Sequence, residues 1–299
     1  MDMKTFEYLY YRTRGFDKQS IMKNADITDE EYDFLEGSLS GVVASIEAER
    51  PAAQNIGADF LRLTRYVYER QSDQENGIAR PDAIKPRSGE IIALPAIGNM
   101  EAPEMSLREA ISIRRSVRDY ADQPLSQNEL SWLLWSSCWA RDFRTNERME
   151  ITLRNVPSAG ARHPFECHLL VRSVDGIAPG LYYYHPIKHC LIATNLSESI
   201  ATEVFDGCLR QGMVMNAAVT FILSAVAYRT IWRYGQRGYR YLYLDAGHVG
   251  QNIHLAAEAI GAGACMIGAF QDEAMNDCIA VDGVEEFVIY IATVGKKKN

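Results

Sequence analysis

The 299-residue chain lacks the signatures of several large classes of protein. Its six cysteines are scattered without a Cys-X-X-Cys pair, which disfavours a disulfide framework and favours reduced thiols in a cytoplasmic protein. No apolar run reaches the roughly 20 residues of a spanning helix, so we expect no membrane contact, and we expect no secretory signal. Basic residues are in deficit, with 31 Lys plus Arg against 39 Asp plus Glu, which argues against general nucleic-acid binding.

Several catalytic motifs are also missing. The sequence contains no G-x-S-x-G, Walker A or G-x-G-x-x-G pattern, which disfavours a serine hydrolase, a P-loop NTPase and a standard Rossmann dehydrogenase. His185 and His189 fall in an expected hairpin, and Asp245 and His248 are spaced as a polar pair at a helix start. None of these spacings predicts a metal site.

The first hundred residues differ from the rest of the chain in composition and in the pattern of apolar residues. A capping box at Thr28–Glu31 and the apolar spacing within 57–70 predict helices. Residues 71–104 are polar and rich in proline, which is typical of an extended connector. We therefore predict a helical N-terminal extension with its connector over residues 1–101, and a second domain over 102–299.

The second domain mixes helix and strand signals without strict alternation, which favours an α+β fold. Helices are predicted from Ser106 to Arg118, after Ser126 and over Asp245–Ile260. Short apolar runs predict strands over 168–171, 180–184, 190–193, 218–226, 264–267 and 287–294. The last two runs are typical of central strands that are covered on both faces.

Arg114, Arg115 and Arg118 form the sharpest local feature, which we call the arginine cluster together with Ser116. On a continuing helix these side chains converge on one edge. Guanidinium groups bind phosphate in a bidentate manner, so the cluster indicates an anion site. The alternative is a solvated helix face whose arginines pair with acidic neighbours, namely Glu109, Asp119 and Asp122.

Small residues mark two further segments. The stretch Pro157-Ser158-Ala159-Gly160-Ala161-Arg162-His163-Pro164 is either an ordinary turn or a loop that lets a flat ligand approach backbone amides. Gly268 and Ala269 end a predicted strand and mark either close ligand approach or a tight exit from the sheet. The tail Lys296-Lys297-Lys298 either reaches a phosphate or is a solvated end.

The stretch from Trp232 to Arg240 is both basic and aromatic. Such a stretch stacks RNA bases, caps an active site or forms a surface loop. Within it, Tyr234 beside Arg233 is a candidate acid–base element, because a neighbouring cation favours the phenolate.

Taken together, these segments resemble the FMN-dependent nitroreductase family. They are most similar to its SagB-type dehydrogenase branch, which includes the azoline oxidases of thiazole- and oxazole-containing peptides. The resembling stretches follow in order across about residues 90–296: Arg114–Tyr120, Pro157–Pro164, Gly180–Tyr184, Tyr241–His248 with Gln251-Asn252, Ile267–Phe270, and Val294-Gly295. The first ninety residues carry no part of the resemblance.

The resemblance implies a mixed, mainly antiparallel sheet flanked by helices, and a homodimer with FMN between its subunits. It implies that the arginine cluster holds the phosphate and ribityl region, and that a tail lysine, Lys296 or Lys298, completes the phosphate site. The residues implied to line the flavin from the partner subunit are Pro157, Ser158, Ala159 and Gly160. Gly268 and Ala269 are implied to approach the flavin ring.

Two positions depart from the family pattern. Ala161 stands where many nitroreductases have Asn, so that flavin contact falls to the backbone. The azoline oxidases have a catalytic Lys-Tyr pair where this chain has Arg233-Tyr234. A guanidinium is a poor proton acceptor, which weighs against azoline oxidation and leaves Tyr234 as the acid–base candidate.

The sequence thus predicts a flavin oxidoreductase that passes hydride from a reduced donor, NAD(P)H, to a small organic acceptor, with Tyr234 and Arg233 as catalytic candidates. Such an enzyme leaves the hard chemistry to the cofactor, which the protein orients and shields from water. One alternative is a tailoring dehydrogenase that acts on a peptide or other natural-product intermediate. Another is a non-catalytic module that binds RNA or a protein through Arg233–Arg240.

Overall fold

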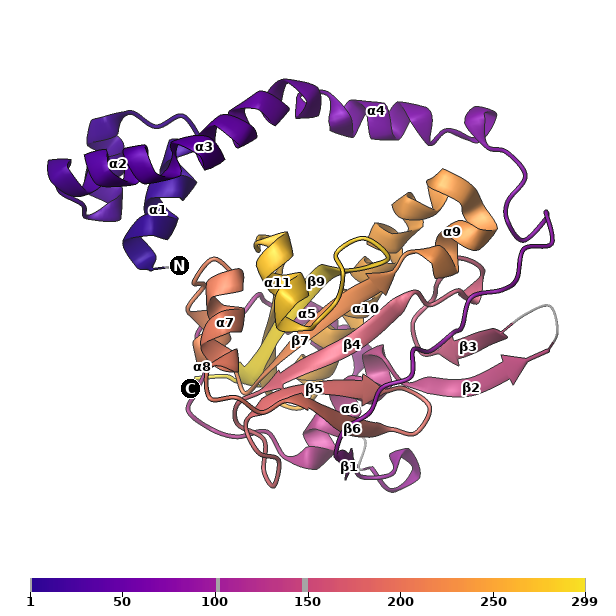
Figure 1. Cartoon of the computed structure of the whole chain (residues 1–299). Coiled ribbons are helices and arrows are strands. Elements are labelled where there is room, and N and C mark those ends of the chain that lie inside the picture. The colour runs from indigo at the N-terminus through magenta and orange to yellow at the C-terminus, as the bar shows by residue number, and fades with distance from the viewer. Residues whose placement is uncertain (1, 101–102, 147–149, 299) are drawn as a thin grey trace. The chain divides into compact units, whose positions relative to one another are not determined.

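The computed structural model describes residues 2–100, 103–146 and 150–298 (Figure 1). Contacts within the chain divide it into two units, Met1–Tyr68 and Glu69–Asn299. The boundary predicted near Ala102 lies outside the described residues, and the division into residues 1–101 and 102–299 stays a prediction. No helix of the described residues is long and apolar enough to cross a membrane.

The first unit is helical. Its elements are α1 (Met3–Arg12), α2 (Lys18–Ala25), α3 (Asp29–Ala53), α4 (Ile56–Leu63) and the short 3-10 helix η1 (Tyr66–Tyr68). The predicted capping box is present, because the Thr28 amide donates to the Glu31 carboxylate and the Glu31 amide donates to the Thr28 hydroxyl. Tyr8, Ile21 and Tyr32 form part of a small core between α1, α2 and α3.

The second unit is built on a seven-stranded sheet with the order β1-β6-β5-β4-β7-β9-β8, in which every strand pair is antiparallel. These strands are β1 (Ile91–Ala93), β4 (Phe165–Val171), β5 (Gly180–His185), β6 (Cys190–Asn195), β7 (Val219–Val226), β8 (Ala262–Ile267) and β9 (Glu286–Lys296). A separate hairpin is formed by β2 (Ala140–Thr145) and β3 (Glu150–Arg154). The predicted α+β class is confirmed.

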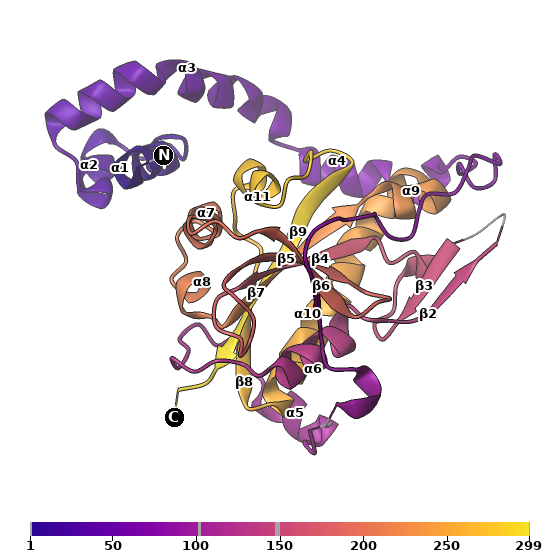
Figure 2. The same ribbon diagram turned by 60° about the horizontal axis from the view of Figure 1, so that its bottom comes forward.

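Helices cover both faces of the sheet (Figure 2). On one face lie α6 (Gln127–Ser137) and the long α10 (Gly238–Ala259), with α5 (Leu107–Ile113) against α10. On the other face lie α7 (Ile200–Gly207), α8 (Met213–Asn216) and α11 (Asp272–Cys278). The remaining elements are α9 (Tyr228–Tyr234) and the 3-10 helices η2 (Ile97–Asn99), η3 (Ala159–Ala161) and η4 (Gly235–Arg237). All seven residues of β4 are buried because both faces are covered.

Two predictions about the edge of this sheet are wrong. The strand at 264–267 is an edge strand, not a central one, since β8 ends the sheet order. The helix predicted to reach Arg118 ends at Ile113. The chain leaves the helix because the Val117 amide donates to the carbonyl of Ala264 at 2.9 Å. Residues 114–118 therefore run along the open edge of β8, with Ser116 forming a parallel bridge to Ala264.

The proline-rich connector belongs to the second unit. The ammonium of Lys85 lies 2.7 Å from the buried carboxylate of Glu286, and the backbone amide of Lys85 donates to buried Glu166 at 3.2 Å. The buried guanidinium of Arg229 pairs with Glu166 at 2.5 Å and donates to the carbonyl of Asp82 at 2.7 Å. Removing one partner of such a buried pair is costly, because the other charge is left without compensation.

Candidate active site

The arginine cluster lies on the extended segment along β8. Its side chains are therefore arranged as on an extended strand, and not as on one face of a helix. The side chain of Arg115 folds back and donates to the carbonyls of Ser112 and Arg114, at 3.1 and 2.8 Å. Among the described residues, the side chains of Arg114, Ser116 and Arg118 make no hydrogen bond or ion pair. The carboxylates named in the alternative interpretation, Glu109, Asp119 and Asp122, form no ion pair with the cluster among the described residues, and Asp119 pairs with Lys298 instead.

The C-terminal half of α10 backs the cluster. Glu258, only 1% exposed, accepts a hydrogen bond from the Arg115 amide at 3.3 Å and pairs with the ammonium of Lys297. His254 lies one turn earlier on α10. Burial lowers the pKa of His254, and the positive charge of Arg114 lowers it further. These contacts place Arg114 and Arg115 beside the last turns of α10.

The three tail lysines point to different partners. Lys296 pairs with Glu129 on α6, and Lys298 pairs with Asp119 at 2.6 Å. Lys297, which sequence reasoning did not single out, shares the Glu258 carboxylate with the Arg115 amide. The phosphate-binding role of Lys296 or Lys298 stays a prediction, and Lys297 is the lysine that the structure joins to the cluster through a common carboxylate.

The segment Pro157–Gly160, which we call the small-residue loop, is fastened to the N-terminal half of α10. The hydroxyl of Ser158 donates to Asp245 Oδ2 at 2.6 Å, and the amide of Ala159 donates to the same oxygen at 3.1 Å. Asp245 is 4% exposed. Burial raises the pKa of Asp245, and the two hydrogen bonds oppose that rise. Asp245 thus fixes the shape of the loop.

Arg233 and Tyr234 lie against the same loop. A β-carbon on Gly160 would lie 2.5 Å from the Tyr234 hydroxyl oxygen and 3.2 Å from Cδ of Arg233, so both side chains contact the loop backbone. Gly160 has a φ of +58°, which glycine adopts without strain. The Tyr234 ring packs edge-on against Tyr241, with 5.0 Å between ring centroids. The basic-aromatic stretch is therefore ordered in α9, η4 and α10 rather than forming a surface loop.

Gly268 and Ala269 follow directly after β8, the strand that the arginine cluster borders. Both are exposed, and the α-carbon of Gly268 faces open space. The carbonyl of Ala269 accepts a hydrogen bond from Gln211 Nε2 at 2.8 Å. The cluster and Gly268 thus lie along one edge of the sheet, with an open surface beside the glycine.

One chain does not bring the arginine cluster and the small-residue loop together. The loop contacts Asp245 and the cluster contacts Glu258, thirteen residues further along α10. That separation is about 20 Å along the helix axis, and it carries the two side chains about 3.6 turns around the helix.

His189 has structural partners at both of its ring nitrogens. The two ring nitrogens of His189 lie 2.8 Å from the Tyr184 hydroxyl and 3.0 Å from the Ser131 hydroxyl, within the predicted β5–β6 hairpin and against α6. Among the described residues, no group of three or more His, Cys, Asp or Glu side chains is arranged to hold a metal ion.

Comparison with known proteins identifies the family. The model described as "Nitroreductase family" matches residues 111–296, which hold the arginine cluster, the small-residue loop, Tyr234 and Gly268. The chain belongs to the nitroreductase family. MJ1384 of Methanocaldococcus jannaschii, a protein named as a nitroreductase, is 34% identical over 194 residues, which cover 65% of this chain and 92% of that protein.

Another relative has a more specific name. The trifolitoxin-processing protein TfxB of Rhizobium leguminosarum bv. trifolii is 33% identical over 110 residues, which cover 36% of this chain but only 30% of TfxB. This likeness supports the SagB-type branch of the nitroreductase family.

Solved structures agree on the fold. A nitroreductase crystal structure from Ralstonia eutropha superposes with a TM-score of 0.57 at 21% identity, covering 74% of this chain and 95% of that one. A nitroreductase from Anabaena variabilis gives a TM-score of 0.53 at 30% identity, covering 63% of this chain and 37% of that one. The nitroreductase-like fold predicted from the sequence is confirmed.

The family is FMN-dependent, and the chain is a flavin-dependent oxidoreductase of this family. The arginine cluster fits the phosphate of FMN, because Arg114 and Arg118 offer guanidinium groups and Ser116 offers a hydroxyl that no described residue engages. Unpaired cations are notable in a chain with a net charge of −8. When bound, FMN supplies hydride transfer at its ring, and the protein supplies position and charge.

Proposed function

We propose that the chain passes hydride from NAD(P)H to an organic acceptor in a site made by two copies. The arginine cluster of one copy binds the FMN phosphate, with Gly268 and Ala269 beside the ring. The small-residue loop of the second copy lines the flavin. The observation that carries this proposal is the separation of about 20 Å along α10 between the partners of the cluster and of the loop.

Two exposed apolar side chains on α10 support the second copy. Tyr243 and Leu244 are each 61% exposed, although the opposite face of α10 packs into the core. Leu107 and Ile111 are also exposed on α5, which contacts α10. Exposed apolar side chains on neighbouring helices are a feature of protein–protein contacts. We infer that α5 and α10 of two copies meet in a homodimer.

Tyr234 and Arg233 have separate roles in this proposal. The hydroxyl of Tyr234, at the small-residue loop, gives a proton to the organic substrate or takes one from it. The guanidinium of Arg233 stays charged and cannot accept that proton. Its centre lies 5.6 Å from the Tyr234 ring centroid, within the range of a cation–π contact.

The first test is the visible spectrum and the mass of the purified protein in solution. We expect flavin absorption bands, a molecular mass of two chains, and oxidation of NADPH or NADH when a nitroaromatic acceptor is added. A colourless protein that stays colourless after incubation with FMN would contradict the proposal. A coloured monomer would contradict the two-copy site while leaving the cofactor in place.

A second candidate function is a tailoring dehydrogenase that acts on a peptide, which the likeness to TfxB favours. An azoline ring in a peptide would lose a hydride and a proton to become an azole, and dioxygen would accept the electrons. Incubation of an azoline-containing peptide with the protein, followed by mass spectrometry, tests for the loss of two hydrogen atoms. Arg233→Lys creates the Lys-Tyr pair of the azoline oxidases, so we expect it to raise this activity and not the nitroaromatic activity.

The proposal includes the cytoplasmic location expected from the scattered, unpaired cysteines. Cell fractionation with an antibody to the chain tests it, and recovery in the membrane or extracellular fraction would contradict it.

A further inference from the structure

The helix that carries Arg233 and Tyr234 is poorly supported by its own sequence. α9 has only seven residues, and neither of its ends has a side-chain cap. Isolated helices of this length are unstable in water, because nucleation costs more than a few internal hydrogen bonds return. The position of Tyr234 therefore depends on what holds α9 from outside.

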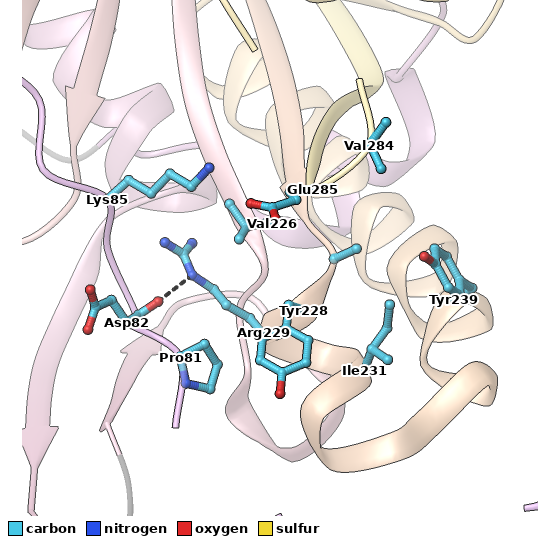
Figure 3. Close-up of a pocket in the computed structure, with 11 residues that line it drawn as sticks. Pro81, Asp82, Lys85, Val226, Tyr228, Arg229, Ile231, Tyr239, Val284 and Glu285 are labelled. Atoms are coloured by element: carbon cyan, nitrogen blue, oxygen red, sulfur yellow. Dashed lines mark hydrogen bonds between the residues drawn. The ribbon is translucent and has the colours of Figure 1, made fainter. Parts of the chain in front are cut away.

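Connector residues 73–82 supply that support. The Tyr228 hydroxyl donates to Asp73 at 2.7 Å, and the backbone amide of Gln74 donates to the carbonyl of Trp232 at 2.9 Å. The indole of Trp232 donates to the carbonyl of Ile78 at 3.0 Å. Arg229 adds the bond to the Asp82 carbonyl described above (Figure 3). Four hydrogen bonds thus join two short segments.

These bonds matter because the connector does not pack continuously against α9. A pocket of about 420 Å³ lies between them. Figure 3 shows Pro81, Asp82 and Lys85 of the connector on one side of the pocket and Ile231 and Tyr239 on the other. Where apolar packing is interrupted, directional hydrogen bonds set the position of the helix.

On its opposite side, α9 faces the small-residue loop. The side chain of Arg162, which is buried and lies two residues beyond the loop, donates from Nε to the Arg229 carbonyl at 2.9 Å. Gly160 contacts Tyr234, as described above. α9 is therefore held between the connector and the loop.

We propose that residues 73–82 are a positioning element of the reaction, which hold α9 so that Tyr234 and Arg233 face the small-residue loop. The inference rests on the proposed function only for the catalytic role of Tyr234. These residues precede the span 111–296 that matches the nitroreductase family, so they add a part to the site from outside that span.

The test is a double-mutant cycle in the full-length, FMN-loaded protein. Tyr228→Phe removes the bond to Asp73 and leaves the ring in place. We expect kcat for nitroaromatic reduction to fall about three- to tenfold, as the loss of one hydrogen bond suggests. FMN content and the KM for NADPH should not change. In a Tyr234→Phe background, Tyr228→Phe should have no further effect, because both changes act through one hydroxyl.

A second measurement does not depend on catalysis. Hydrogen exchange of the backbone amides of residues 228–238 should be faster in Tyr228→Phe and in Asp73→Ala than in the parent protein. Lys4→Ala, which breaks an exposed ion pair with Glu31 in the first unit, is the matched control and should change neither quantity.

The outcomes distinguish the positioning role of residues 73–82 from the catalytic role of Tyr234. Unchanged exchange over residues 228–238, or independent and multiplicative effects of Tyr228→Phe and Tyr234→Phe on kcat, would overturn the inference. If Tyr234→Phe alone leaves kcat unchanged, the catalytic role of Tyr234 fails, and the exchange result still decides whether the connector holds α9.

Discussion

The arginine cluster and the small-residue loop meet the same ligand in the proposed site, but they are built in opposite ways. In the cluster, Arg114 and Arg118 have no partner among the described residues. In the loop, Ser158 and Ala159 are already bonded to a buried carboxylate, Asp245. The cluster therefore offers unused charge to a ligand, whereas the loop offers a shape that is fixed beforehand.

This difference separates two contributions to binding. Unpaired, partly exposed cations gain most from a phosphate, and that gain decreases with added salt because mobile ions screen it. A preformed loop contributes by avoiding the entropy cost of ordering on binding. Substitutions in the cluster should therefore act on FMN affinity, and substitutions behind the loop should act on stability first.

The largest expected effect is that of Arg118→Ala. Loss of one charge-assisted hydrogen bond costs roughly 1.5–3 kcal/mol, which corresponds to about 10- to 100-fold weaker FMN binding. Fluorescence titration of the FMN-free protein measures the dissociation constant. Arg108→Ala, on the neighbouring α5, is the control and should bind FMN as the parent does. Equal affinity of Arg118→Ala and the parent would remove the cluster from the phosphate site.

Asp245→Ala should weaken FMN binding less than Arg118→Ala does, but it should lower the stability of the fold more. The change leaves the Ala159 amide and the Ser158 hydroxyl without their acceptor, at a cost of about 1–3 kcal/mol in the free energy of unfolding. Urea denaturation measures that cost. Asp245→Asn keeps one oxygen acceptor and should lose less. If both variants were as stable as the parent, the loop would not be held by Asp245.

The smallest expected effect is on the pH dependence of stability, through His163 next to the small-residue loop. Burial, together with nearby arginines, lowers the pKa of His163 to about 3 from 6.5. The folded chain thus holds His163 neutral while the unfolded chain protonates it, so this contribution to stability is complete above pH 6.5 and decreases as the pH falls toward 3. His163→Gln should flatten the decline in Tm between pH 6.5 and 4, whereas exposed His248→Gln should not. Parallel profiles for His163→Gln and the parent would show that His163 does not contribute.

Sequence reasoning identified the arginines of the cluster but not their local structure. Their residue types and the capping box at Ser106 are readable in the sequence, and the amide of Glu109 does donate to the Ser106 hydroxyl at 3.2 Å. The end of that helix is decided by Ala264, which takes the Val117 amide into an edge pairing. A contact nearly 150 residues distant leaves no periodic signal, so the helix was predicted to continue.

The partners of the loop were missed for the same reason. Asp245 was predicted only as a neighbour of His248 at a helix start, whereas its carboxylate binds the loop residues Ser158 and Ala159. An Asp on the core-facing side of α10 is the signal that could have indicated a specific partner, because a buried carboxylate needs hydrogen-bond donors. The connector was predicted to be extended, but three of its four bonds to α9 depend on backbone carbonyls, which sequence does not reveal.

The most direct test of the two-copy site mixes two defective chains. Arg118→Ala alone should have little activity at limiting FMN because its cluster binds the phosphate poorly, and Asp245→Ala alone should have little activity because its released loop no longer lines the flavin. In a mixed dimer, one site combines the intact cluster of one chain with the intact loop of the other. Random exchange in an equal mixture makes half of the dimers mixed, so about a quarter of the parental activity should return. Activity no higher than the mean of the two separate variants would contradict a site shared between copies.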